Sequence, residues 1–135
     1  EVEKEKSMGR RLSDGAPLTG GVESDPMDLD ATDAAGRLTI PLNAHARRAS
    51  SQGTLEKFLR RPFNYDDVAA GGASSQGLIF FAYTTNIADR FTPVLARLTA
   101  MDALNKWTTP VGSATFVIPP TWPTGGYLAQ ELVEG

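Results

Sequence analysis

The sequence predicts a mixed α+β fold, because two apolar segments of strand length flank a long amphipathic helix. Residues 77–83 form an apolar, aromatic-rich run that is typical of a strand. Residues 87–107 carry apolar side chains every three or four positions, which indicates an amphipathic helix. Residues 114–119 form the second apolar run. This order fits half of a ferredoxin-like layer, which needs four strands and two helices when complete.

The part of the chain before the first predicted strand is poor in regular structure. Residues 1–6 are a charged run that either ends a helix or frays at a terminus. Residues 19–39 are rich in Gly, Asp, Thr and Ala, and we expect them to form an extended surface loop. Residues 54–60 are predicted as a short helix, capped by Thr54 and ended by Pro62.

The predicted strand and helix each have expected boundaries. Residues 66–76 are rich in Gly, Ala and Ser and are predicted to form a turn. The strand at 77–83 is expected to be buried on both faces because its side chains do not alternate in polarity. The helix at 87–107 is expected to open near Asp89, with Pro93 tolerated in its first turn.

Composition excludes several classes of function. The 135-residue chain has a formal net charge of −3, which does not suit a nucleic-acid-binding surface. It contains no cysteine, so disulfides, thiolate chemistry, zinc–cysteine sites and iron–sulfur clusters are excluded. No apolar run approaches the roughly 18 residues of a membrane span. We therefore expect no nucleic-acid partner and no membrane span.

The one histidine of the chain, His45, lies among clustered arginines. Arg47 and Arg48 follow it within three residues, and a second pair, Arg60 and Arg61, comes fifteen residues after His45. Arginine binds carboxylate and phosphate through two parallel hydrogen bonds, so this density of cations indicates a dianionic group. A transition metal or haem iron with a nitrogen ligand would have to use His45. The alternative is an ordinary hydrogen-bonded imidazole.

Five segments in order resemble the dye-decolorizing (DyP-type) haem peroxidases. Residues 44–49, Ala-His-Ala-Arg-Arg-Ala, resemble the proximal-histidine motif of that family. Residues 59–67, Leu-Arg-Arg-Pro-Phe-Asn-Tyr-Asp-Asp, resemble its distal-arginine segment. Residues 8–18, 77–83 and 101–105 add three weaker matches. The resemblance covers about residues 7–135 and is best to the actinobacterial, A-type branch.

The resemblance implies a fold and an activity for the chain. Residues 1–135 would be the C-terminal portion of the haem domain, which is the second ferredoxin-like domain of a two-domain peroxidase of the dimeric α+β barrel type. The N-terminal domain and the segment with the distal aspartate are not matched, so an N-terminal fragment of the same peroxidase is an expected partner. The implied activity is oxidation of dyes or phenolic compounds by hydrogen peroxide, with one haem b per assembled protein.

The resemblance also implies roles around the haem iron. His45 would be the proximal metal ligand, and Asp102 would hold its other ring nitrogen, which makes the imidazole more basic. Arg60 would be the catalytic distal cation that favours charge separation as the O–O bond breaks. The alternatives are a solvent-facing acid for Asp102 and a salt bridge at a helix end for Arg60.

Four further residues are implied to contact the cofactor. Arg10 and Arg47 would bind the haem propionates, and the alternative for both is an ordinary surface arginine. Leu78 and Phe80 lie two positions apart, so they share a face of the strand and would form a wall of the distal pocket. Their simpler interpretation is core packing.

Two other functions and the location of the protein stay open at this point. The chain is either a peroxidase, a non-catalytic haem-binding or iron-handling module, or a remnant that binds nothing. Related A-type members often carry a twin-arginine export signal, so the resemblance implies a secreted or extracytoplasmic protein, and otherwise a cytoplasmic one. The reductant is expected to be aromatic.

Overall fold

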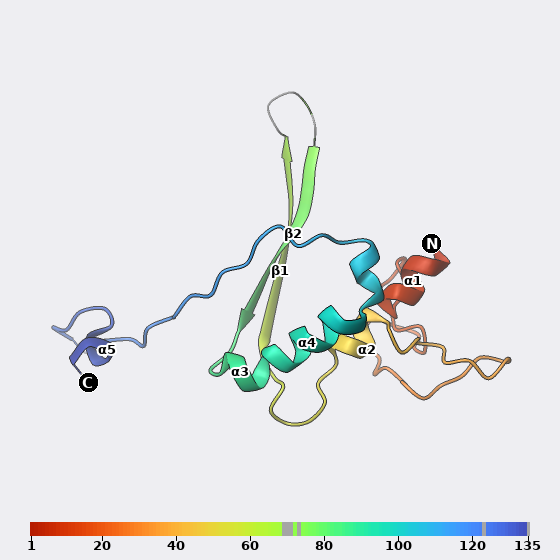
Figure 1. The fold of residues 1–135 in the computed structure, drawn as a ribbon, viewed down its shortest axis with the longest axis horizontal. Coiled ribbons are helices and arrows are strands. Elements are labelled where there is room, and N and C mark those ends of the chain that lie inside the picture. The colour runs from red at the N-terminus through yellow and green to blue at the C-terminus, as the bar shows by residue number, and fades with distance from the viewer. Residues whose placement is uncertain (69–71, 73, 123, 135) are drawn as a thin grey trace.

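The computed structural model describes residues 1–68, 72, 74–122 and 124–134, in which three parts are distinct (Figure 1). A group of helices contains α1, α2, α4 and η1, a long β-hairpin projects from it, and the C-terminal segment crosses the hairpin and ends in α5. No helix among these residues is long and apolar enough to cross a membrane. The elements in order are α1 (Val2–Met8), α2 (His45–Ala49), β1 (Leu59–Val68), β2 (Ser74–Tyr83), α3 (Ile87–Arg90), α4 (Thr92–Met101), η1 (Ala103–Lys106) and α5 (Gln130–Glu134).

The helices enclose a small core. Ile40, Ala44 and Val94 are almost completely buried there. Gly9 ends α1 in the left-handed conformation, with φ of 85°. A Cβ atom at this position would lie 3.2 Å from Cγ2 of Ile40 and 3.3 Å from Cβ of Ala44. Glycine therefore satisfies the turn and also lets α1 approach the start of α2 closely.

The hairpin pairs β1 and β2 in antiparallel register, from Leu59 opposite Tyr83 to Val68 opposite Ser74. Paired residues point to the same face, and successive residues alternate between faces. One face, which we call the arginine face, contains Arg60, Pro62, Asn64, Leu78, Phe80 and Ala82. On the opposite face the rings of Phe63, Phe81 and Tyr83 follow one another, with centroids 6.0 and 6.3 Å apart. Both sides of the hairpin thus carry apolar side chains together with charged ones, such as Arg60 on one side and Arg61 on the other.

The predicted helix over residues 54–60 is wrong. Residues 54–58 form no regular element, and Leu59 and Arg60 begin β1. The apolar spacing in this segment was compatible with one turn of helix, but pairing with β2, the next strand of the hairpin, decides the outcome. Pro62 lies within β1, opposite Phe80, and does not end a helix.

The predicted strand at residues 77–83 is confirmed and begins earlier, at Ser74. Its predicted burial on both faces is wrong for the described residues, because Leu78 is 58% exposed and Phe80 is 46% exposed. The predicted turn over 66–76 is shorter than expected, since residues 66–68 and 74–76 are in strands. Residues 69–71 and 73 lie outside the described residues.

The predicted helix over residues 87–107 is divided into α3, α4 and η1. Asn86, rather than Asp89, caps α3, because its side chain accepts a hydrogen bond from the backbone N–H of Asp89 at 3.0 Å. Pro93 lies in the first turn of α4, as predicted. Asp102 interrupts the helix with an extended backbone, and η1 follows it directly.

Two predictions concern irregular segments. The second predicted strand is wrong, since residues 114–119 form no regular element and pair with no strand in the described chain. Phe116 and Val117 in it are 80% and 79% exposed. The predicted surface loop at residues 19–39 is confirmed, apart from an isolated bridge between Thr32 and Leu38.

Candidate functional site

The imidazole of His45 and the carboxylate of Asp102 meet at the junction of α2, α4 and η1. His45 is the first residue of α2, and Asp102 lies between α4 and η1. Nδ1 of His45 is 2.6 Å from Oδ2 of Asp102. Oδ1 of Asp102 accepts a hydrogen bond from the backbone N–H of Leu104 at 2.9 Å, which caps η1. Both carboxylate oxygens therefore have fixed partners.

This contact leaves one ring nitrogen of His45 for a ligand. With the carboxylate of Asp102 as acceptor, Nδ1 carries the proton and Nε2 keeps its lone pair. Nε2 makes no hydrogen bond within the described residues, and the side chain of His45 is 33% exposed. The side chain of Asp102 is only 3% exposed, so its interaction with His45 is shielded from water. The donor set is that of an axial imidazole ligand to a metal.

His45 is the only candidate ligand of this kind in the part of the chain that the structure describes. No group of three or more His, Cys, Asp or Glu side chains there is arranged to hold a metal ion. A single imidazole suits a metal whose other ligands come from a cofactor, as in haem, where the porphyrin supplies four nitrogens. The residues present therefore fit haem better than a metal ion bound by protein groups alone.

Arg60 connects the hairpin to the helix of His45. Its Nη2 donates a hydrogen bond to the carbonyl oxygen of Ala49, the last residue of α2, at 2.8 Å. Its guanidinium carbon lies 4.9 Å from the ring centroid of Phe58. Near Arg60, at the start of β1, the arginine face of the hairpin is thus directed toward α2. Leu78 and Phe80 lie on the same face.

Arg10 and Arg47 bind backbone carbonyl groups of the N-terminal loops. Nη1 of Arg10 donates to the carbonyl oxygens of Gly15 and Glu23 at 2.7 and 3.1 Å. Nη2 of Arg47 donates to those of Leu29 and Ile40, and Nε also donates to that of Ile40. The two side chains therefore hold the surface loop against the helices. Their roles toward propionates stay predictions.

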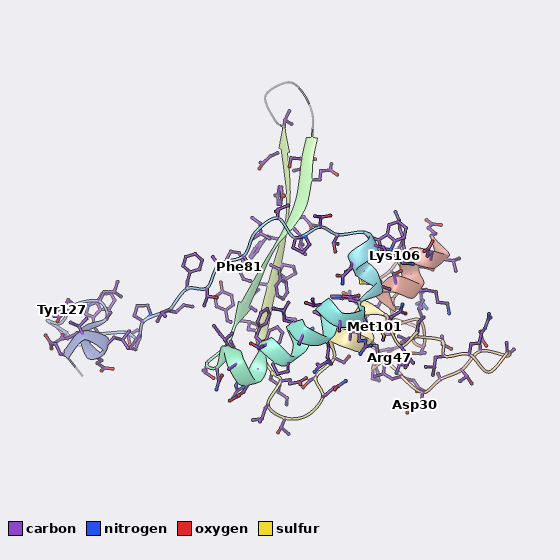
Figure 2. The ribbon with its side chains drawn as sticks, in the orientation of Figure 1. Asp30, Arg47, Phe81, Met101, Lys106 and Tyr127 are labelled. Atoms are coloured by element: carbon purple, nitrogen blue, oxygen red, sulfur yellow. The ribbon has the colours of Figure 1, made fainter. Side chains whose placement is uncertain are left out.

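Arg48, the neighbour of Arg47, points another way. Its Nη2 donates to Sδ of Met101 at 2.7 Å, at the end of α4 beside α2 (Figure 2). Its Nε is buried and has no hydrogen-bond partner among the described residues. The two consecutive arginines after His45 thus have different surroundings, which the sequence does not reveal.

Sequence reasoning missed a second polar cluster, formed by Arg97 of α4 and Glu56. Nη1 and Nη2 of Arg97 lie 2.8 and 2.7 Å from the two carboxylate oxygens of Glu56. Arg97 also donates to the carbonyl oxygens of Arg48 and Ser50 at 3.3 and 3.0 Å. Hydrogen bonds from Arg97 and from the backbone N–H of Gln52 lower the pKa of Glu56 to about 2. No local pattern signals this pair, because its members are 41 residues apart.

Comparison with known proteins identifies the family. The family model for the C-terminal part of Dyp-type peroxidases matches residues 2–122. The chain belongs to this family. Its mixed helices and hairpin therefore represent part of the α+β fold of DyP-type peroxidases, as the sequence predicted.

Relatives and solved structures of DyP-type peroxidases resemble nearly the whole chain. A dye-decolorizing peroxidase of Thermobifida fusca is 41% identical over 135 residues, which is 98% of this chain and 31% of the relative. A deferrochelatase of Yersinia pestis is 34% identical over 138 residues, again 98% of this chain and 31% of the relative. The chain thus spans about a third of the length of these curated relatives.

Two crystal structures show how similar the folds are. A DyP-type peroxidase from Cellulomonas bogoriensis is 50% identical with a TM-score of 0.90, covering 98% of this chain and 37% of that protein. Ferric DtpA from Streptomyces lividans is 37% identical with a TM-score of 0.76, covering 99% of this chain and 38% of that protein. The DyP-type fold therefore extends through this chain.

Proposed function

We propose that this chain supplies the proximal histidine and the distal arginine of a haem peroxidase, which uses hydrogen peroxide to oxidise dyes or phenolic compounds. The single observation that supports this most is the 2.6 Å contact between Nδ1 of His45 and the buried carboxylate of Asp102. A carboxylate at this nitrogen makes the opposite nitrogen a stronger ligand to iron. Similarity to a dye-decolorizing peroxidase over 98% of the chain supports the reaction class.

In this proposal the haem, one haem b per assembled protein, supplies the oxidation–reduction chemistry of the reaction. His45 would hold the iron through Nε2, the ring nitrogen that does not face Asp102. Asp102 keeps the proton at Nδ1 and fixes the plane of the ring, because its other oxygen is held by the N–H of Leu104. Both carboxylate oxygens are thereby committed, so the imidazole has one stable orientation and one tautomer.

Arg60 is the proposed catalytic cation of the opposite haem face. Its Nη1 and Nε make no hydrogen bonds to the described residues, so these donors are available to a peroxide oxygen. A fixed guanidinium favours the deprotonated form of peroxide and stabilises charge that develops as the O–O bond breaks. Leu78 and Phe80, on the same face of the hairpin, would keep water from this space.

Arg10 and Arg47 are the proposed propionate contacts, and their geometry limits how they act. Each already holds loop carbonyls, so a propionate would bind to the remaining donors of a guanidinium that is fixed in place. Such preorganisation reduces the entropy lost on binding. Both residues would then link the surface loop to the edge of the cofactor.

The experiment compares His45→Ala and Arg60→Leu in the intact protein. We expect His45→Ala to lose the Soret absorption band, and Arg60→Leu to keep it while peroxide-dependent dye bleaching falls. Arg61→Leu is the matched control, because the side chain of Arg61 lies on the opposite face of β1 from Arg60. Retention of a normal Soret band by His45→Ala, or equal losses of activity in the two arginine variants, would contradict the proposal.

A second candidate is a haem-iron handling module without peroxidase activity. The 34% identity to a deferrochelatase of Yersinia pestis favours it. The haem-loaded protein would be incubated without peroxide and followed by absorption and fluorescence. Release of iron with appearance of free porphyrin supports this candidate, whereas peroxide-dependent dye oxidation with intact haem supports the peroxidase.

The expected partners follow from the proposed reaction. They are haem, hydrogen peroxide, an aromatic reductant and the N-terminal part of the same peroxidase, which would bring the distal aspartate. The chain covers only 31% of the Thermobifida fusca relative, and the family model that it matches is that of the C-terminal part, which supports an N-terminal part as partner. Twin-arginine export is proposed from the resemblance to the A-type branch alone.

A further inference from the structure

Arg97 contacts three residues at the end of α2 and shortly after it. From the middle of α4 it binds both oxygens of Glu56 and the carbonyl oxygens of Arg48 and Ser50. The side chains of Arg97 and Glu56 are 15% and 13% exposed. A two-point arginine–carboxylate pair that is mostly shielded from water has a defined geometry.

The helix that carries His45 depends on such contacts for its position. It has only five residues, and Ala44 at its N-terminus provides no side-chain cap. A single isolated turn of helix is unstable, because nucleation fixes several dihedral angles for few hydrogen bonds. Its C-terminal carbonyl groups need external donors, and Arg97 and Arg60 supply them.

Both ends of α2 are attached to the same neighbouring helix. At the start, the ring of His45 contacts Asp102, the residue that ends α4. At the end, the carbonyl oxygen of Arg48 and the residue after the helix, Ser50, contact Arg97, five residues earlier in the sequence than Asp102. A shift of the C-terminal end of α2 along α4 would therefore turn the imidazole relative to the carboxylate.

We propose that Arg97, held in place by Glu56, is a positioning residue that sets the orientation of the His45 ring toward Asp102. The relevance of this role to catalysis rests on the proposed function, but the effect on the ring does not require haem. The rigid fork of arginine is needed because one side chain must reach a carboxylate and two carbonyl oxygens at once, which a lysine ammonium on a flexible chain does poorly.

Glu56 keeps this arrangement over the pH range in which proteins are normally folded. With its pKa lowered to about 2 by Arg97 and the N–H of Gln52, it stays ionised in mildly acidic solution. The same pair also fixes residues 50–56, the segment that connects α2 to β1. The distance between His45 and the arginine face of the hairpin is thus set partly by one ion pair.

The test uses Arg97→Met and Arg97→Lys in the intact protein. Arg37→Met is the matched control, since Arg37 also pairs with a carboxylate, that of Asp33, but in the surface loop. The main measurement is the Nδ1–H signal of His45 in haem-free protein labelled with ¹⁵N-histidine, assigned by its loss in His45→Gln. A short hydrogen bond to a carboxylate gives this proton a strongly downfield signal. The second measurement is haem affinity.

Both Arg97 variants should move the Nδ1–H signal upfield or broaden it, whereas the control should leave it unchanged. Haem affinity should fall about tenfold, the lower end of the effect of disturbing the partner of a metal-binding histidine. If Arg97→Met does not fold, Arg97→Lys decides, because it keeps the charge beside Glu56. A normal His45 signal together with normal haem affinity in a folded Arg97→Lys protein refutes the positioning role.

The two proposals can fail separately. If His45→Ala keeps haem, the proposed function fails, and the Nδ1–H signal of haem-free Arg97→Lys still decides the positioning role. If His45→Ala loses haem while both Arg97 variants match the control in signal and affinity, only the positioning role fails.

Discussion

In Asp102→Asn, a side chain with one acceptor oxygen must replace a carboxylate whose two oxygens face two different N–H groups. In the native structure Oδ2 faces Nδ1 of His45 at 2.6 Å, and Oδ1 accepts from the N–H of Leu104 at 2.9 Å. Asparagine has one oxygen and one NH₂ group. If its oxygen faces Leu104, its NH₂ group faces Nδ1, and the ring must move its proton to Nε2. That tautomer cannot bind iron through Nε2.

The size of the effect follows from two independent estimates. A hydrogen bond to a charged group contributes about 1.5–3 kcal/mol. Loss of the partner of a metal-binding histidine costs about 10–100-fold in affinity, which corresponds to about 1.4–2.8 kcal/mol. We therefore expect the dissociation constant of haem to rise between ten and a hundred times in Asp102→Asn.

Haem titration of the haem-free protein, followed at the Soret band, measures this change. Asp89→Asn is the control, because Asp89 is also a carboxylate near a helix start but is exposed, and its carboxylate accepts a hydrogen bond from the side-chain NH₂ group of its neighbour Asn86. Urea unfolding of both haem-free variants separates loss of stability from loss of the ligand. A haem affinity and Soret spectrum of Asp102→Asn equal to those of the wild type would show that the contact does not control the imidazole.

Three further predictions concern other positions. Glu56→Gln should lower the stability of the protein above pH 4.5. The wild type loses the same stability as pH falls from about 4.5 toward about 2, because Glu56 then becomes protonated. Acid unfolding monitored by circular dichroism measures both changes. Gly9→Ala should lower the free energy of unfolding by more than Gly36→Ala does. Gly36 has open space around it, so its replacement costs only the roughly 1–2 kcal/mol of left-handed strain, whereas a Cβ atom at Gly9 would also meet Ile40 and Ala44. Equal losses of stability in urea unfolding would contradict the close packing at Gly9. Arg60→Leu should reduce peroxide turnover by about 10²–10³ at unchanged haem content, and turnover within a factor of two of the wild type would exclude a catalytic role.

The sequence predicts local elements well where they depend on local chemistry. The apolar run at 77–83 is a strand, Pro93 lies in a first turn, and residues 19–39 form a loop. It fails where pairing with another strand overrides the local pattern. Leu59 and Arg60 fit a helical pattern but join a strand, because β2 offers them hydrogen bonds over the whole length of the hairpin.

The sequence likewise predicts some contacts of the candidate site and not others. Motif order places His45 and Asp102 in one site, and the structure brings these residues together although they are 57 positions apart. The role of each toward iron stays a prediction. The use of Arg47 for loop carbonyls depends on how the loop lies against α2, and the pairing of Arg97 with Glu56 depends on how α4 packs against α2. No residue pattern near either arginine indicates this packing.

The hairpin has a consequence for handling the chain. Rings and aliphatic groups are exposed on both of its sides, between charged residues such as Arg61 and Asp67, and two paired strands without a third are marginally stable. Uncovered strands of this kind recruit further strands edge to edge, which is how ordered aggregates grow. Purification at low concentration and prompt addition of binding partners would limit this growth.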